Sequence, residues 1–172
     1  MKNIKNANGF TLIELLAVIV VLAIVILMAS MAVVPRMNDA RKQVFTMEAN
    51  EAINAASSYL MNSALTATNN QTFPTTEGGT VCLTIRDLVE NGDFKNKKDY
   101  EGRIIVKKQG QNYLYVVSMT NKKLMVVNAG AGDSYDKSTE IATDDIKDYD
   151  STEAAKFNCK DDNAKWPTKS GS

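Results

Sequence analysis

The sequence contains no histidine, only two cysteines among 172 residues, and no excess of either charge, because twenty basic side chains balance twenty acidic ones. Without histidine, Ser-His-Asp and Cys-His nucleophiles are excluded, as are histidine-ligated zinc and the commonest general base near neutral pH. A net charge of zero argues against the electrostatic footprint of non-specific nucleic-acid binding, so no specific nucleic-acid partner is expected. These absences disfavour an enzyme, and we predict no catalytic residue, no cofactor and no metal site.

Glycine is absent from residues 10–77, and the only prolines there are Pro35 and Pro74. The residue types that favour a helix, such as alanine, leucine and methionine, are frequent in this stretch. We therefore predict one long helix over residues 10–67, which would reach roughly 85 Å and project from a head only about 30 Å across. Pro35 removes one helical hydrogen bond and clashes one turn back, which predicts a helix kink or local melting over residues 30–34.

The first half of this helix is apolar on every side. Residues 15–34 carry no charge, and Ser30 is their only polar side chain. A helix of about twenty residues spans the hydrocarbon core of a bilayer, whereas a soluble core helix would show a polar face. We predict that residues 10–34 cross the membrane before assembly. Since exposed apolar surface of this size promotes association, the same residues should later form the core of a homo-oligomeric filament.

A secretory signal peptide cleaved near Ser30-Met31-Ala32 is the competing interpretation, since Lys2 and Lys5 precede the apolar region. Its apolar region would exceed the usual length of about 7 to 15 residues, and Glu14 interrupts it. We therefore favour the membrane-spanning helix.

The second half of the helix is amphipathic. Its apolar residues recur at spacings of three and four, which places them on one face: Phe45, Ala49, Ala52, Ile53, Ala56, Leu60 and Ala64. The small alanines would let another layer approach closely, so this alanine stripe should lie against a sheet made by the rest of the chain.

Residues 68–172 should form a globular head. A strand is predicted over residues 80–85 and helical turns over 86–92, followed by an antiparallel meander of three strands over 103–108, 113–120 and 124–128. One apolar face of the meander should cover the alanine stripe, and it is formed by Ile104, Val106, Leu114, Val116, Leu124 and Val126 or by their alternates. The predicted fold class is α+β: a long N-terminal helix, with a transmembrane half and an amphipathic half, packed on a small antiparallel sheet.

An acidic section follows the meander, with eight acids between Asp133 and Glu153. Calcium takes oxygen ligands of the kind offered by Asp144, Asp145, Asp148 and Asp150. Their spacing matches no EF-hand loop, and a solvated acidic surface explains the same residues. We therefore predict surface exposure rather than a metal site.

Cys82 and Cys159 are candidates for a disulfide. Such a bond would tie the C-terminal section to the start of the sheet, and an exported protein permits it. Sequence alone does not pair two cysteines so far apart.

Glu14 is a lone carboxylate near the start of the apolar segment. An ionised carboxylate in hydrocarbon costs on the order of 2.5 to 3.5 kcal/mol, so such residues are usually paired. No cation on the same helix lies within reach of Glu14. If the chain were cut between Gly9 and Phe10, the new α-amine of Phe10 would be a suitable partner, supplied most naturally by a neighbouring copy.

The run KNANGFTLIEL from Lys5 to Leu15, followed by the apolar span, resembles the class III signal peptide of type IV pilins and their relatives, the pseudopilins of type II secretion and the competence pilins. The resemblance implies that a prepilin peptidase cleaves after Gly9 and N-methylates Phe10, and that Glu14 serves assembly. It also implies an assembly ATPase and a platform protein as partners. Pro35 lies a few residues further from the cleavage point than the family's usual proline, and the glycine often found in the span is missing.

We predict a structural subunit of a type IV pilus, of the major pilin type, that supports surface motility, adhesion or biofilm formation. The precursor should reside in the cell membrane and the assembled pilus on the extracellular surface. A pseudopilin of a type II secretion or competence (DNA uptake) system, or a membrane-anchored binding domain, are the alternatives that the sequence leaves open.

Overall fold

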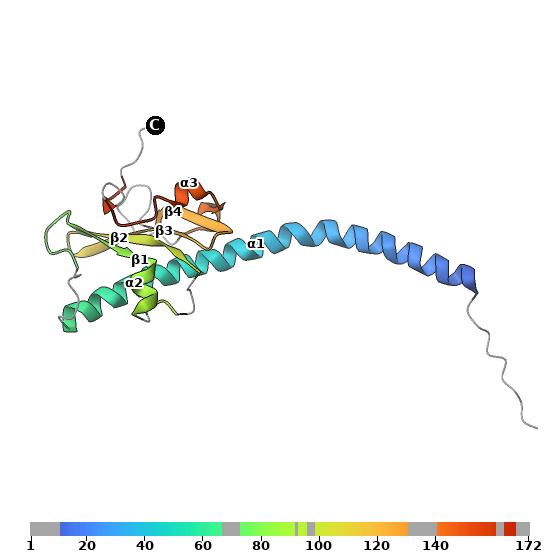
Figure 1. Ribbon diagram of the computed structural model, residues 1–172, viewed down its shortest axis with the longest axis horizontal. Coiled ribbons are helices and arrows are strands. Elements are labelled where there is room, and N and C mark those ends of the chain that lie inside the picture. Colours follow the sequence, from blue (N-terminus) through green and yellow to red (C-terminus); the bar gives the residue numbers. More distant parts are fainter. Residues whose placement is uncertain are drawn as a thin grey trace, which may run out of the picture. The chain divides into compact units, whose positions relative to one another are not determined.

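The computed structural model describes residues 11–66, 73–91, 93–95, 99–130, 141–160 and 164–167. The chain divides into two compact units, Met1–Arg41 and Lys42–Ser172. The described part of the first unit is helical and belongs to α1, which runs from Leu12 to Thr66 (Figure 1). The predicted long N-terminal helix is confirmed, and its predicted end residues 10 and 67 lie outside the described residues.

Pro35 lies inside α1, and the residues around it stay helical. The local melting predicted over residues 30–34 is therefore wrong for this structure. A proline removes a single helical hydrogen bond, and the turns before and after it keep theirs. The Ser30 hydroxyl adds a further bond one turn back, donating to the carbonyl of Ile26 at 2.8 Å. A kink at Pro35 stays a prediction.

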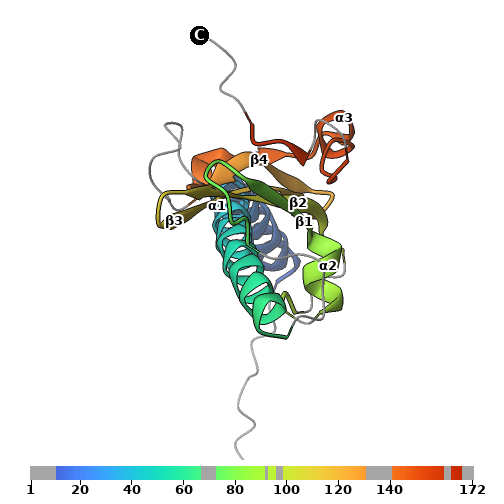
Figure 2. The same cartoon turned by 90° about the vertical axis from the view of Figure 1, so that its left-hand side faces the viewer.

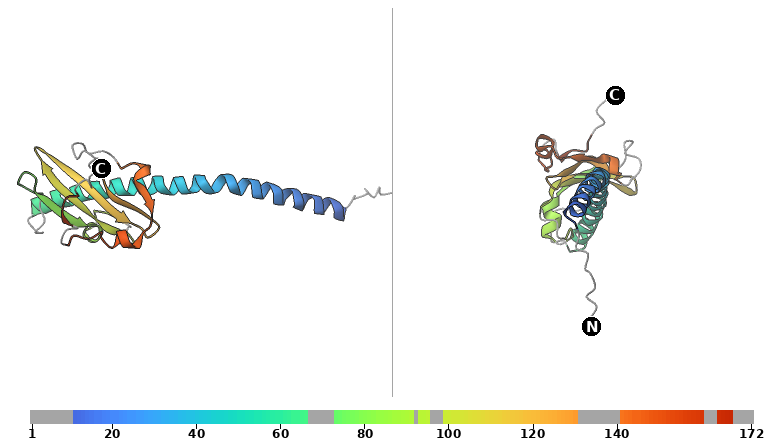
Figure 3. Two further views of the ribbon diagram at one scale, coloured as in Figure 1. Left: turned by 90° about the horizontal axis from the view of Figure 1, so that it is seen from above. Right: turned by 90° about the vertical axis from the view of Figure 1, so that its right-hand side faces the viewer.

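The second unit packs residues 42–66 of α1 against one face of a five-stranded sheet (Figure 2). Each strand is antiparallel to the one before it, so the spatial order β1-β2-β3-β4-β5 follows the chain (Figure 3). The strands are β1 (Thr80–Thr84), β2 (Glu101–Gln109), β3 (Asn112–Thr120), β4 (Leu124–Gly130) and β5 (Ile146–Asp148). The short helices are α2 (Ile85–Glu90), η1 (Thr143–Asp145) and α3 (Ser151–Ala154). The α+β class and the antiparallel meander are confirmed, whereas β5 was not predicted.

The alanine stripe of α1 forms the helix side of the main core. Ala49, Ala52 and Ala56 are fully buried. They belong to one apolar cluster with Ile104 and Val106 of β2. An alanine side chain lets the helix backbone approach the sheet closely, and the large side chains of the strands fill the remaining space. The predicted packing of the stripe on the sheet is confirmed from Phe45 to Leu60, whereas Ala64, which was also predicted to belong to it, is exposed.

The residues of β3 that face the helix are not Leu114 and Val116 but the residues that alternate with them along the strand. Ile104 pairs with Val117 and Val106 with Tyr115, and paired residues of an antiparallel ladder point to the same face. Leu114 and Val116 therefore lie on the opposite face, where they form a second cluster with Trp166. We name the face toward α1 the helix face and the other the outer face.

The outer face is covered by the described residues of 150–167, which include α3 and which we name the C-terminal cover (Figure 2). Several contacts hold this cover. Among them are the packing of Trp166 on β3, a disulfide between Cys82 and Cys159, hydrogen bonds from Arg103 of β2 and a hydrogen bond from the N–H of Asp150 to the sulfur of Met125 in β4. The second unit thus has three layers, with the sheet in the middle.

Replacing Ala56 by leucine should destabilise the second unit by about 1–3 kcal/mol, because a larger side chain overpacks the fully buried contact between helix and sheet. Ser58→Leu is the matched control, since Ser58 lies exposed on the same helix and its change should stay within about 0.5 kcal/mol. Urea unfolding of the full chain in detergent micelles measures both. Equal losses in the two variants would contradict this packing.

Candidate processing and assembly site

The predicted cleavage point lies at the N-terminal edge of what the structure describes. Gly9 and Phe10 are outside the described residues, which begin at Thr11. Glu14 is described, on the first turn of α1. The described residues therefore show how Thr11 and Glu14 begin the helix immediately after the predicted cleavage point.

Thr11 and Glu14 form a capping box. The backbone N–H and the hydroxyl of Thr11 both donate to Oε2 of Glu14, each at 2.9 Å. In return, the N–H of Glu14 donates to the Thr11 hydroxyl at 3.4 Å and to the Thr11 carbonyl at 3.1 Å. This reciprocal arrangement satisfies backbone donors that the first turn of a helix leaves unpaired. A carboxylate at this place also interacts favourably with the positive end of the helix dipole.

The sequence carried a signal for this cap, since Thr11-Leu-Ile-Glu14 matches the capping-box spacing. Glu14 was interpreted only as a charge that needs a cation. The structure adds that the carboxylate has hydrogen-bond partners on its own chain, although no cation of the described residues is among them. Both bonds from Thr11 end on Oε2, and within the described residues no hydrogen bond reaches Oε1.

The helix that follows Glu14 exposes its apolar surface. The large apolar side chains from Leu12 to Met28 are between 48% and 83% exposed. By length and composition α1 can cross a membrane. Ser30 carries the one polar side chain of residues 15–34. Its hydroxyl donates to the carbonyl of Ile26 on the same helix, which is how a hydroxyl is satisfied in lipid. The segment thus combines a capped, charged start with an apolar surface that the monomer leaves uncovered.

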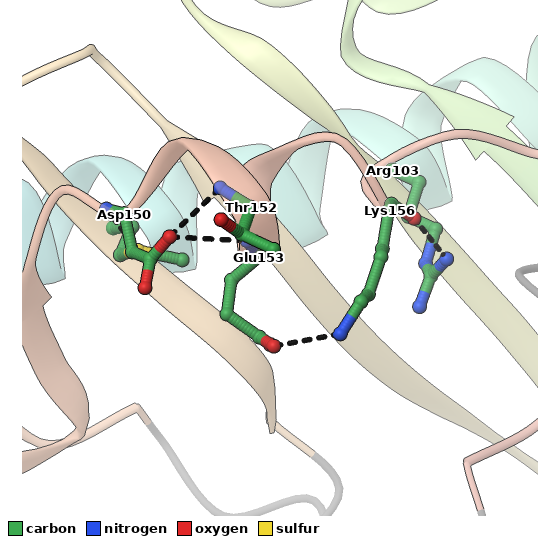
Figure 4. Close-up of polar contacts among 6 residues, drawn as sticks. Arg103, Asp150, Thr152, Glu153 and Lys156 are labelled. Carbon is green, nitrogen blue, oxygen red and sulfur yellow. Dashed lines mark hydrogen bonds and ion pairs between the residues drawn. The ribbon is translucent and has the colours of Figure 1, made fainter.

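The acidic section has local structural roles where it is described. Asp145 accepts a hydrogen bond from the N–H of Ala142 at 2.9 Å. Asp150 caps α3 by accepting from the N–H groups of Thr152 and Glu153 (Figure 4), and these bonds lower the pKa of the Asp150 carboxyl. Among the residues that the structure describes, no group of three acidic or cysteine side chains is placed to hold a metal.

Cys82 and Cys159 are joined by a disulfide that links β1 to the C-terminal cover. Beside it lies Arg103, which is 7% exposed. Its guanidinium donates to the carbonyl of Lys156 at 2.6 Å (Figure 4). It also donates to the carbonyl of Asn158 at 3.2 Å. Burial lowers the pKa of Arg103. Sequence reasoning missed Arg103, because its partners are backbone carbonyls that no motif reveals.

Residues 4–30 match the family described as "Prokaryotic N-terminal methylation motif". No curated protein and no solved structure matches the chain. The methylation motif, the long helix and the antiparallel sheet together give the chain a pilin-like architecture, and the motif implies processing by a prepilin peptidase. Pilin-like proteins are typically structural and non-enzymatic. The apolar helix and the disulfide are consistent with a membrane precursor and an extracytoplasmic domain.

Replacing Thr11 by valine removes the hydroxyl of the capping box at constant shape. The first turn of α1 should then be destabilised by about 1 kcal/mol, which is about a fivefold faster amide exchange at Glu14 and Leu15. Hydrogen exchange of the full chain in micelles, followed by NMR, measures this. Thr11→Ser keeps the hydroxyl and should exchange as the wild type does. Wild-type exchange in the valine variant would show that the cap does not stabilise the helix.

Proposed function

We propose that this pilin-like protein is the major, repeating subunit of a type IV pilus. The precursor spans the cell membrane through residues 10–34. Prepilin peptidase cleaves between Gly9 and Phe10 and methylates the new terminus. The mature subunits then leave the lipid and pack their helices into the core of an extracellular filament, with the heads as its outer shell. Such a filament serves surface motility, adhesion or biofilm formation.

The exposed surface of α1 is the observation that carries this proposal. A stretch from Leu12 to Met28 in which every large apolar side chain is about half exposed or more has no stable place in water. Lipid covers it in the precursor, and helices of other copies can cover it in an assembly. The heads need no such cover from a neighbour, since their own helix residues 42–66 and the C-terminal cover enclose both faces of the sheet.

Glu14 is proposed to pair with the methylated α-amine of Phe10 on an adjacent subunit. Its Oε2 is engaged by Thr11, whereas Oε1 can accept a further donor. A charge-assisted bond of this kind inside an apolar core would fix the axial position of each new subunit, because an offset subunit would leave both charges unpaired.

Assembly by this route needs an external energy source. Lipid tails are as apolar as the helix, so exchanging lipid for protein gains little from the hydrophobic effect. Close packing and the Glu14 pair favour the filament, but they do not lift a membrane-spanning helix out of the bilayer unaided. We therefore propose an assembly ATPase and its platform protein as partners.

Electron microscopy of the cell surface, with and without this chain, tests the proposal directly. Long filaments that depend on the chain and contain it throughout their length are expected for a major pilin. A pseudopilin of a secretion or DNA-uptake system would give at most short fibres, and a membrane-anchored binding domain would give none.

Gly9→Val should block processing, because a β-branched side chain at the cleaved bond fills space that glycine leaves open to the peptidase. The variant should stay in the membrane fraction at precursor size, which immunoblotting measures. Asn8→Val places the same side chain one residue earlier and controls for the general effect of the change on the leader. A mature-sized band from Gly9→Val would refute cleavage at this bond.

Glu14→Gln separates the two roles of the carboxylate. The amide oxygen can still accept from Thr11, so insertion and processing should be normal. The charge is lost, so the yield of sheared filaments should fall on the order of tenfold or more, in line with the value of a charged hydrogen bond. Ser30→Ala, which alters a polar group bonded within its own helix, should leave the yield unchanged. Normal filament yield from Glu14→Gln would sink the proposed pairing.

A further inference from the structure

Arg103 holds the C-terminal cover at the place where the disulfide forms. Its two carbonyl partners, Lys156 and Asn158, come from the three residues just before Cys159. Asn128 supports the guanidinium from β4 through a bond of 3.4 Å to its Oδ1. Asn128 is itself fixed, since it exchanges hydrogen bonds of 2.9 and 3.0 Å with the hydroxyl of Ser118. One side chain therefore connects the middle of the sheet to the cover.

The strand register places Arg103 and Cys82 on the same face. Cys82 pairs with Ile105 in the β1–β2 ladder, so these two side chains point to one side. Arg103 precedes Ile105 by two residues and shares its face. Because Leu83 and Ile104 belong to the cluster on the helix face, this is the outer face. The arginine and the cysteine thus stand next to each other beneath the cover.

The carbonyl of Asn158 belongs to the peptide bond that leads into Cys159. A peptide unit is planar, so fixing this oxygen also fixes the Cα of Cys159 to within a rotation about the bonds that flank the plane. The turn before it is ordered locally, with the N–H of Asn158 bonded to the Lys156 carbonyl at 2.9 Å. The Phe157 side chain is buried at the centre of this turn. Two bonds from Arg103 therefore position the second cysteine of the pair.

We propose that Arg103 is the positioning residue for oxidation of Cys82 and Cys159. The two cysteines are 77 residues apart, and closing so long a loop in a mobile chain is entropically costly. When the guanidinium binds the carbonyls of Lys156 and Asn158, the cover docks before any covalent bond exists and the thiols already face each other. The inference rests on the head alone and does not depend on filament assembly.

The covalent step is a thiol–disulfide exchange with a small or protein disulfide as oxidant. The thiolate of one cysteine attacks the oxidant, forming a mixed disulfide and releasing one thiolate of the oxidant. The second cysteine then attacks the mixed disulfide and releases the other. The two protein thiols lose two electrons and two protons, and the oxidant becomes two thiols. Cys82 and Cys159 are half-buried rather than enclosed, so an oxidant can reach them.

Docking and oxidation are coupled in both directions. If the bonds of Arg103 raise the effective concentration of one thiol at the other, the disulfide must strengthen those bonds by the same factor. In a reducing compartment the cover is then held by its non-covalent contacts, among them those of Arg103 and Trp166. In an oxidising one it is locked over the outer face.

The test is the redox equilibrium of the full chain in detergent micelles against mixtures of reduced and oxidised glutathione. Alkylation with a maleimide polymer and gel electrophoresis give the fraction oxidised. For Arg103→Met we expect the effective concentration of the thiol pair to fall about tenfold or more, since bonds to a charged group are lost. A tenfold fall raises the reduction potential of the pair by about 29.6 mV. Arg103→Lys should give an intermediate value, because one ammonium does not form the planar fork that reaches both carbonyls.

Two variants separate positioning from general stability. Val117→Ala removes buried methyl groups of β3 on the helix face of the same sheet, away from the cover, and should leave the thiol equilibrium within twofold of wild type. Lys108→Met removes another cation of β2, one that donates to a backbone carbonyl outside the cover, that of Thr75 at 2.8 Å, and should do the same. An equal fall in Val117→Ala and Arg103→Met would overturn the proposal, as would wild-type values in both arginine variants. If Arg103→Met does not fold, a wild-type equilibrium in Arg103→Lys decides against it.

Discussion

The apolar surface of α1 is the constraint on which the rest of the structure depends. One continuous helix from Leu12 to Thr66 carries two different surfaces. Residues 42–66 have a narrow stripe of alanines, which a sheet of the same chain covers. Residues 15–29 are apolar all round, and no single sheet could cover such a surface. The alanine stripe is covered within the chain, whereas the apolar surface of the first half must be covered by lipid or by other copies. The folding of the head and the proposed assembly therefore involve the same helix.

The energetic cost of the Glu14 carboxylate at the start of this apolar surface is lowered partly by groups of its own chain. The carboxylate accepts two hydrogen bonds from Thr11 and stands at the positive end of the helix dipole. The inference from sequence concerned a cation for this charge, supplied most naturally by the amine of a neighbouring copy, and that pairing stays a prediction. The capping box lowers the energetic cost of the Glu14 charge in both the precursor and the mature monomer. The α-amine of Phe10 on a neighbouring subunit would add the charge neutralisation that the cap lacks. This neutralisation would favour the docking of one subunit on the next.

The absence of glycine and the scarcity of proline were enough to predict the long helix, spacings of three and four its alanine stripe, and short β-rich runs separated by turn residues the meander. None of these signals decided which face of β3 meets the helix. Both faces of that strand are apolar, with Val117 and Met119 on one and Leu114 and Val116 on the other. An alternation pattern cannot orient a strand that is buried on both sides. Strand β5 has three residues, two of them charged, and carried no recognisable pattern. Arg103 could not be found either, since its carbonyl partners lie more than 50 residues away.

A sheet that is apolar on both faces needs two covering layers, and the second of these is poor in apolar residues. Within its described part, the C-terminal cover contributes chiefly Phe157 and Trp166 to the hydrophobic contacts. Burying two aromatic side chains contributes only a few kcal/mol, which the entropy of ordering more than a dozen residues would exceed. The cover therefore requires contacts that hold the backbone itself. Arg103 supplies these contacts by binding backbone carbonyls, and the disulfide prevents the cover from detaching from the sheet. Both faces of the sheet must be buried. On the helix face, apolar packing is sufficient. On the outer face the covering segment is too polar for packing alone, so charged and covalent contacts hold it in place.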